Sequence, residues 1–274
     1  MMSATRLLEV NDLSKSFGGL VVMNRLSFSL EEGETLGIIG PNGSGKSTLG
    51  KLIKGLLSPL SGQILIDGQA LKPGEIPSRV GYVFSNPENQ IVSTVVEEDV
   101  AFGLENMGMD PARIRLRVAE SLTWVGMEAY RHHSPHLLSG GQQQKVVLAG
   151  ILAMGSEVLV LDEPTSMLDP GQQKEILNLL RKIQERGKKT VLHITHSVEE
   201  ALGAQDLVVL NRGRVSFYGP AEDFFFGDRR PEWEWGEMPR LFRLIQGLRR
   251  RRHPIPAGVR SIEELKRFLL DRKG

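Results

Sequence analysis

The sequence of 274 residues contains no cysteine. Disulfide bonds and metal sites with thiolate ligands are therefore excluded, and a reducing compartment fits this composition. The chain also lacks an uninterrupted apolar run of about 18 residues, the length that a membrane-spanning helix needs. Its first residues, MMSATRLLEVND, have no apolar core of the kind found in signal peptides. We therefore expect neither a transmembrane helix nor a secretory leader.

A strong charge of either sign is missing as well. The formal net charge is +1, so the chain as a whole has no field that would attract nucleic acid. Repeats and low-complexity tracts are also absent from the sequence. With 40% hydrophobic and 24% charged residues, the composition suits one large α/β domain with room for a small appendage.

The most informative motif that is present is rich in glycine. Residues 40–48, GPNGSGKST, fit the pattern G-x-x-x-x-G-K-[ST] of a phosphate-binding loop, or P-loop. A buried strand is predicted before it at 35–39 and a helix after it at 46–57. Lys46 would reach the β- and γ-phosphates, and the Ser47 hydroxyl would bind Mg²⁺. The alternative is a chance turn, against which the five constrained positions and their context argue. The residues predicted to bind nucleotide here are Gly40, Asn42, Gly43, Ser44, Gly45, Lys46, Ser47 and Thr48.

Two carboxylates follow a second buried strand. The apolar run 158–161 ends in Asp162 and Glu163. Downstream of a P-loop, a carboxylate at such a strand end holds Mg²⁺, and a second carboxylate beside it can polarise a water molecule. A strand at 190–194 then leads to His196, which we expect to face the γ-phosphate. A solvated strand end is the alternative for the carboxylates, and a structural histidine is the alternative for His196.

For two further stretches the residues alone allow either a role in nucleotide binding or a purely structural role. Phe17 lies just before the nucleotide site, where an aromatic ring can stack on a base. By spacing alone, packing of Phe17 into the core is favoured. Residues 138–142, LSGGQ, place Ser139 as the N-cap of a helix over 142–154, and two glycines there would form a second anion-binding helix terminus. A solvated loop that enters a helix is the alternative for this stretch.

The remaining elements suggest a helical insertion and a tail. Helices are predicted at 95–107, 111–125 and 170–186, with Asp110 as the N-cap of the second. Strands are predicted at 7–10, 26–30, 63–66 and 79–84, with a hairpin over 207–218. The formal net charge is −3 over residues 1–219 and +4 over 220–274, so we interpret the tail as a small separate module with helices at 239–251 and 261–271. Its basic run 249–252 suits either an anionic partner or a solvated helix end. An exposed loop is favoured over a metal site for His132, His133 and His136.

Taken together, these stretches resemble the ATP-binding cassette (ABC) ATPases over residues 5–220. Walker A is 40–48, the signature is 138–142, Walker B is 158–162, the D-loop is 166–169 and the switch histidine is His196. The resemblance implies an α/β P-loop NTPase with an antiparallel β subdomain, a RecA-like core and a helical subdomain at about 85–155. It also implies a head-to-tail dimer in which each ATP lies between Walker A of one subunit and the signature of the other. In such a dimer Phe17 would stack on adenine. The other residues that the resemblance assigns to ATP are Ser139, Gly140, Gly141, Gln142 and Asp169.

A narrower resemblance comes from residues 86–91, NPENQI, and 96–103, VEEDVAFG. They look like the ATPase subunits of energy-coupling factor importers, which carry vitamins or transition-metal ions. This implies that residues 86–102 dock on a transmembrane scaffold subunit at the cytoplasmic face of the cell membrane, beside a substrate-binding membrane subunit. It also implies a dimerising C-terminal extension at 221–274. The alternatives are another ABC importer, a soluble ABC protein of translation or DNA repair, and a degenerate regulatory subunit. The presence of Glu163 and His196 argues against the last.

One position departs from the family pattern. The family has Gln where this chain has Ser85, and that Gln contacts Mg²⁺ and the attacking water. A serine hydroxyl is shorter, so we expect Ser85 to reach Mg²⁺ only through a bridging water. Alternatively, Gln90 could fold back and supply the amide. We also expect dependence on a partner ATPase that keeps the Gln, which would give a dimer with two unequal sites.

Overall fold

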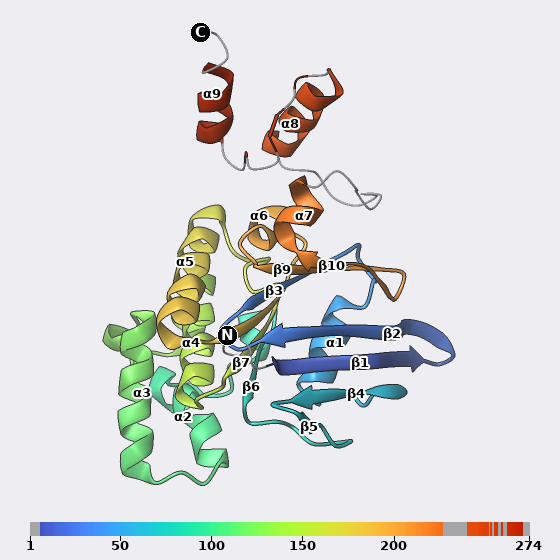
Figure 1. Ribbon diagram of the computed structural model, residues 1–274. Helices are drawn as coiled ribbons and strands as arrows, with labels where there is room; N and C mark the ends of the chain where they lie inside the picture. The colour runs from blue at the N-terminus through green and yellow to red at the C-terminus, as the bar shows by residue number, and fades with distance from the viewer. Residues whose placement is uncertain are drawn as a thin grey trace, which may run out of the picture.

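A computed structural model describes residues 6–226 and 240–270, except positions 252, 254, 257, 258, 260 and 261. Figure 1 shows two sheets side by side, a layer of helices on one flank and the C-terminal helices above them. In the predicted C-terminal helices, Pro239, Ser261 and Asp271 lie outside the described residues, as do Arg252 of the basic run and Pro254 of the linker.

The larger sheet has six strands in the order β10-β9-β3-β8-β7-β6. Its strands are β3 (Thr35–Ile39), β6 (Val80–Val83), β7 (Val158–Asp162), β8 (Thr190–Ile194), β9 (Asp206–Asn211) and β10 (Arg214–Pro220). All neighbouring strands are parallel except the β9–β10 hairpin. Strands β3, β6, β7 and β8 are buried along their whole length, as expected for a parallel sheet that is covered on both faces. The carboxyl ends of these strands therefore meet at one edge of the sheet.

The smaller sheet is antiparallel, with the order β2-β1-β4-β5. Its strands are β1 (Arg6–Phe17), β2 (Leu20–Glu31), β4 (Ser61–Ile66) and β5 (Gln69–Ala70). Both β1 and β2 are longer than predicted, because several register shifts break their alternating pattern without ending the pairing. Helix α1 (Lys46–Ile53) joins the two sheets, since its Leu49, Leu52 and Ile53 share one apolar cluster with residues of both. The helix ends four residues earlier than predicted.

The helical layer contains most of residues 87–187. Its helices are η1 (Pro87–Asn89), α2 (Val96–Asn106), α3 (Pro111–Val125), η2 (Glu128–Tyr130), η3 (Pro135–Leu137), α4 (Gly140–Ala153) and α5 (Pro170–Gly187). The predicted N-caps are confirmed: Asp110 accepts two backbone N–H groups of α3, and Ser139 and Gln142 form a capping box on α4. One apolar cluster joins α2, α3, α4 and α5 to the faces of β7 and β8. This packing places the start of α4 beside the start of α5.

The C-terminal part adds four helices, α6 (Val198–Ala201), α7 (Ala221–Phe226), α8 (Arg240–Arg250) and α9 (Ile262–Leu270). The sequence patterns did not predict α6 or α7, which have only four and six residues. Helix α7 opens the predicted separate module, yet its Phe224 and Phe225 lie in one apolar cluster with residues of β9 and of the tail. The tail is therefore joined to the larger sheet through α7.

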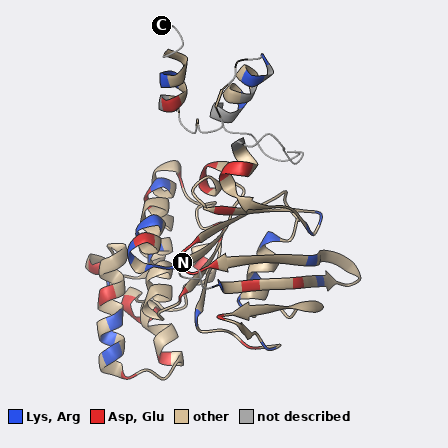
Figure 2. Ribbon diagram, viewed as in Figure 1, with Lys and Arg blue, Asp and Glu red and all other residues tan. Residues whose placement is uncertain are grey.

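Within the described ranges, no helix is both long and apolar enough to span a bilayer. Figure 2 shows Lys and Arg interspersed with Asp and Glu over the coloured part of the chain, including α3 and α5. This distribution agrees with the near-zero formal net charge and gives no uniformly basic face for nucleic acid on those helices.

Candidate active site

The P-loop follows β3 and enters α1, as predicted. Gly40, Gly43 and Gly45 have φ angles of 154°, 77° and 102°, which residues with a Cβ rarely adopt. At Gly40 a Cβ would lie 2.2 Å from the Leu210 carbonyl oxygen, so no other residue fits there without a shift of the backbone. At Gly43 a Cβ would meet no atom within 4 Å, so the left-handed backbone, and not crowding, selects glycine there. The loop has the shape of an anion cradle at a helix N-terminus.

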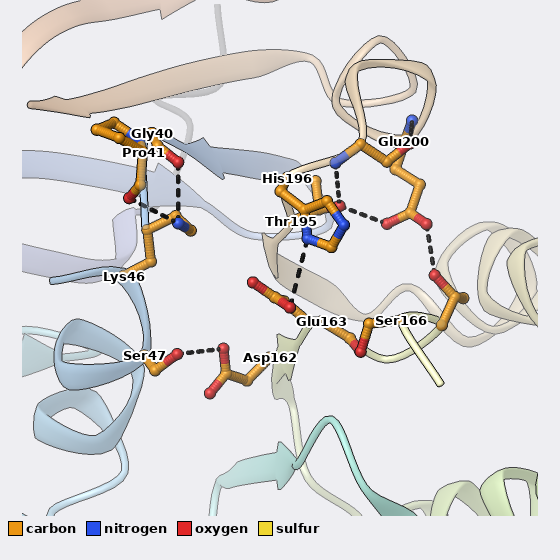
Figure 3. Close-up of polar contacts among 12 residues, drawn as sticks. Gly40, Pro41, Lys46, Ser47, Asp162, Glu163, Ser166, Thr195, His196 and Glu200 are labelled. Atoms are coloured by element: carbon orange, nitrogen blue, oxygen red, sulfur yellow. Dashed lines mark hydrogen bonds and ion pairs between the residues drawn. The ribbon is translucent and has the colours of Figure 1, made fainter. Parts of the chain in front are cut away.

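Lys46 lies over this loop (Figure 3). Its Nζ donates to the carbonyl oxygens of Gly40 at 2.9 Å and Pro41 at 3.2 Å. Burial lowers the pKa of Lys46, and the charges of Glu163 and Asp162 act in the opposite direction. These two hydrogen bonds leave donor capacity on the ammonium group, which has three N–H bonds. The Lys46 ammonium therefore fits a phosphate that would lie in the cradle.

Ser47 and Asp162 form a pair of oxygen ligands beside the loop. The Ser47 Oγ donates to Asp162 Oδ1 at 2.9 Å, although the two residues are 115 positions apart. The other oxygen, Asp162 Oδ2, accepts a hydrogen bond of 2.6 Å from the Tyr82 hydroxyl of β6. Burial and the Asp162 charge raise the pKa of Tyr82, which keeps this hydroxyl protonated as a donor. A hydroxyl and a carboxylate held this way fit Mg²⁺, which prefers hard oxygen ligands.

Glu163 and His196 meet at the ends of β7 and β8. The His196 Nδ1 lies 3.4 Å from Glu163 Oε2, and both side chains are accessible to solvent. Glu163 has a φ of 52°, a left-handed conformation that costs a non-glycine residue on the order of 1 kcal/mol. Its backbone N–H donates to the Ile194 carbonyl, which ties the two strand ends together. The structure thus brings both predicted catalytic side chains to the edge of the sheet that carries the P-loop (Figure 3).

Ser85 and Gln90 follow β6. Both amide atoms of Gln90 bond to backbone, because Nε2 donates to the Tyr82 carbonyl and Oε1 accepts from the Phe84 N–H. This geometry argues against the alternative in which Gln90 replaces the missing glutamine. Ser85 lies three residues beyond Tyr82, the neighbour of Asp162, so its role towards Mg²⁺ stays a prediction.

Phe17 and the signature lie outside this cluster. Phe17 is the last residue of β1 and is 45% exposed, so it does not pack into the core, and the Lys15 Nζ lies 5.0 Å from its ring centroid. Gly140 and Gly141 lie against the side chains of Leu168 and Gln172, next to the D-loop. Asp169 caps α5 through the N–H groups of Gly171 and Gln172. Across the described ranges, no hydrogen bond or ion pair joins residues 138–142 to the P-loop.

Comparison with known proteins identifies the family. A family model described as ABC transporter matches residues 23–166, from within β2 to the first residue of the D-loop. The chain belongs to the ABC transporter family. It is an ATPase of that family, whose members couple ATP hydrolysis to transport. The cradle, the lysine and the two carboxylates described above are groups of the kind that P-loop ATPases use towards ATP.

Curated relatives narrow the placement of this ABC ATPase. The energy-coupling factor transporter ATP-binding protein EcfA1 of Symbiobacterium thermophilum is 45% identical over 250 residues, which cover 89% of this chain and 87% of the relative. The protein of the same name from Clostridium perfringens is 41% identical, with 89% of each chain covered. This ABC ATPase therefore groups with the ATP-binding proteins of energy-coupling factor transporters.

Solved structures agree with this placement. The structure of cbiO1 from Clostridium perfringens, described as part of the ABC transporter complex cbiONQ, has a TM-score of 0.74 and 34% identity. The match covers 80% of this ABC ATPase and 90% of the cbiO1 chain. The dimeric ATP-binding cassette MJ0796, bound to ADP and Pi, has a TM-score of 0.68 and 28% identity. The match covers 78% of this ABC ATPase and 98% of the MJ0796 chain. The predicted α/β fold of an ABC-type P-loop NTPase is thus confirmed.

Two polar contacts described above were not predicted: the Tyr82 hydroxyl on Asp162, and the Gln90 amide on the backbone. Tyr82 is an ordinary residue of a buried strand in the sequence, and only the pairing of β6 with β7 places it beside Asp162. The last residue pair of these two strands is Val83 and Leu161, two residues before Ser85 and one residue before Asp162. No local sequence signal would have identified these contacts.

Replacement of Ser85 tests its predicted contact. Ser85→Gln should leave ATP binding nearly unchanged and preserve or raise the hydrolysis rate, because the longer amide restores the contact found in the family. The ATPase rate of Ser85→Gln, Ser85→Ala and the unmodified chain would be measured against Mg²⁺ concentration. Equal rates for Ser85→Ala and the unmodified chain would remove any ligand role for Ser85. A large loss in Ser85→Gln would show that the pocket is shaped around serine.

Proposed function

We propose that this chain is the ATP-hydrolysing subunit of an energy-coupling factor importer that takes up a vitamin or a transition-metal ion. The observation that carries the proposal is the cluster of Lys46, Ser47, Asp162, Glu163 and His196 at one sheet edge, in a chain that groups with energy-coupling factor ATPases. All the chemical parts of an ATPase are present, which a degenerate regulatory subunit would not need.

Each residue has a separate task. Glu163 accepts a proton from the attacking water, and His196, 3.4 Å away, orients that carboxylate and faces the γ-phosphate. Lys46 and the N–H groups of the P-loop stabilise charge on the phosphoryl oxygens. Ser47 and Asp162 would hold Mg²⁺, which would supply positive charge beside the phosphoryl oxygens. Phe17, exposed at the end of β1, stacks on adenine.

A second ATPase subunit completes the site. In one chain the signature packs beside the D-loop and makes no polar contact with the P-loop among the described residues. Ser139, Gly140 and Gly141 are therefore available to the nucleotide of a partner in a head-to-tail dimer. The partner is either a second copy or a paralogue, and a paralogue that keeps the glutamine would give two unequal sites. The extension over 221–274 adds to the dimer contact.

The surface around residues 86–102 is suited to a membrane subunit at the cytoplasmic face. Pro87 is buried and anchors η1, while Val92 and Phe102 are 61% and 48% exposed. A groove runs between α2 and α3, lined by Glu97, Ala101, Ile114, Arg115 and Val118 among others. Apolar side chains beside charged ones suit a scaffold helix that carries both kinds of residue.

Substitutions on this surface test the docking. Glu88→Lys combined with Phe102→Asp should reduce co-purification with the scaffold at least about tenfold, because each buried anchor is worth more than 1 kcal/mol. Nucleotide affinity should stay within about twofold, because Glu88 and Phe102 are exposed residues of η1 and α2 and are not part of the P-loop. Gln90 is left unchanged in this test, because its side chain bonds to the backbone at Tyr82 and Phe84.

Ile76→Asp is the matched control, because Ile76 is 58% exposed but lies in the loop between β5 and β6. If the docking variant assembled normally, the surface assignment would be wrong. Loss of ATP affinity with intact assembly would equally contradict it. A chain that never co-purifies with a membrane scaffold, even unmodified, would favour a soluble ABC protein instead.

A further inference from the structure

A buried carboxylate lies behind the exposed pair Glu163 and His196. The side chain of Glu200, in α6, is only 7% exposed. Its Oε1 accepts a hydrogen bond of 2.5 Å from the Thr165 hydroxyl, and its Oε2 accepts one of 2.7 Å from the Thr195 hydroxyl. Figure 3 shows Glu200 turned towards the strand end that carries Thr195 and His196. The two oxygens of one carboxylate thus reach two different segments.

These two segments are the ones that carry the catalytic pair. Thr165 lies two residues after Glu163, and Thr195 directly precedes His196. Further bonds tie α6 to the same turn: the Ser197 N–H donates to Thr195 Oγ1, and the Glu200 N–H donates to Ser197 Oγ. The Thr195 hydroxyl therefore accepts one bond and donates the other, which fixes its rotamer.

A third neighbour sets the charge of this group. The His193 Nε2, in β8, lies 3.1 Å from Glu200 Oε2. Burial alone would raise the pKa of Glu200, but His193 and the two threonine hydroxyls outweigh it and lower the pKa to about 2. Since this pKa is below the ordinary value of 4.5, the ionised group stabilises the fold above that value, and its contribution is lost as the pH falls towards 2. At neutral pH Glu200 is an anion that only accepts hydrogen bonds.

We propose that Glu200 is a positioning residue that holds the Glu163 turn and the His196 turn at a fixed separation through Thr165 and Thr195. The proposal rests on the catalytic roles given to Glu163 and His196 above. Glu163 lies in a left-handed conformation on a short turn, and His196 is largely exposed, so neither is held by packing of its own. Misplacement of a catalytic group by about 1 Å can cost about 10²-fold in rate, so a rigid link behind the pair has a direct effect on turnover.

If Glu200 positions the catalytic pair, its substitution should lower kcat and leave KM nearly unchanged, which a residue that only stabilises the fold would not do. Glu200→Gln keeps the size of the side chain but turns one acceptor into a donor, so one of the two threonine bonds must rearrange. We expect kcat to fall about 10-fold with the KM for MgATP within about twofold, because ATP itself does not touch Glu200. Thr195→Val should give a similar loss, and Thr195→Ser should restore most of the rate because it keeps the hydroxyl.

The decisive measurement is a double-mutant cycle in the assembled transporter complex, with MgATP as the substrate and thermal unfolding followed in parallel. If Glu200 acts through Thr195, the variant Glu200→Gln with Thr195→Val should be no slower than the slower single variant. Glu199→Gln is the matched control, since it lies on the same helix and is exposed. Losses that multiply would overturn the proposal, as would a kcat within twofold of the unmodified complex in Glu200→Gln.

Two further variants distinguish a failure of the positioning role from a failure of the proposed function. Glu163→Gln and His196→Ala are assayed in the same complex. If they retain turnover, the catalytic assignment fails and the positioning role fails with it. If they lose turnover while the Glu200 and Thr195 variants do not, only the positioning role is overturned. A lower melting temperature with unchanged kcat would assign Glu200 to stability alone and would also overturn it.

Discussion

Glu163→Gln should slow ATP hydrolysis at least about 10²-fold while ATP still binds, because the amide cannot accept the proton of the attacking water. A loss of this size corresponds to about 2.7 kcal/mol of transition-state stabilisation. The contact of Glu163 with His196, 3.4 Å away, survives in part because the amide oxygen can still face the imidazole. The P-loop, Lys46 and Asp162 are untouched, so the nucleotide should be held and the closed dimer should accumulate.

The hydrolysis rate would be measured in the assembled complex. The fraction of dimer in the presence of MgATP would be measured with the isolated ATPase. Glu199→Gln serves as the control, since it makes the same chemical change on an exposed side chain of α6. Turnover close to that of the unmodified complex would rule out Glu163 as the base. Loss of nucleotide binding would show instead that Glu163 supports the shape of the site.

Lys46→Ala should have the second large effect, which combines weaker ATP binding with slower hydrolysis. Lys46 is 6% exposed, and in the described structure its ammonium group bonds only to the two loop carbonyls of Gly40 and Pro41. Removal of one preorganised donor of this kind typically costs about 10² to 10³ in rate. We expect a loss of that size in kcat/KM, together with a clear rise in the Kd for ATP.

Lys51→Ala is the matched control for Lys46, because Lys51 lies on the same helix one turn and a half further on. Nucleotide affinity would be measured by titration with a fluorescent ATP analogue, and unfolding by heat would check that both variants fold. An unchanged Kd and rate for Lys46→Ala would remove Lys46 from the site. A fall in melting temperature alone would assign it to holding the loop.

The sequence by itself identified the P-loop, the carboxylates Asp162 and Glu163, and His196. Each of these signals is local, because a glycine-rich loop or a polar residue after a buried strand is set by neighbours in the chain. The N-caps Asp110 and Ser139 were predicted for the same reason, since a cap depends on the next three residues. Strands β1 and β2 were underestimated, because register shifts interrupt their period without ending their pairing.

Only the tertiary structure decided which distant residues meet. The strand order β3-β8-β7-β6 places Tyr82 against Asp162 and the end of β8 against Glu163, and neither neighbour can be inferred from spacing along the chain. Helix α6 is too short to have a periodic signal, yet its Glu200 joins Thr165 and Thr195. Hydrogen bonds of this kind depend on the register between strands and on packing across the sheet, and these are determined by the whole fold and not by any single segment.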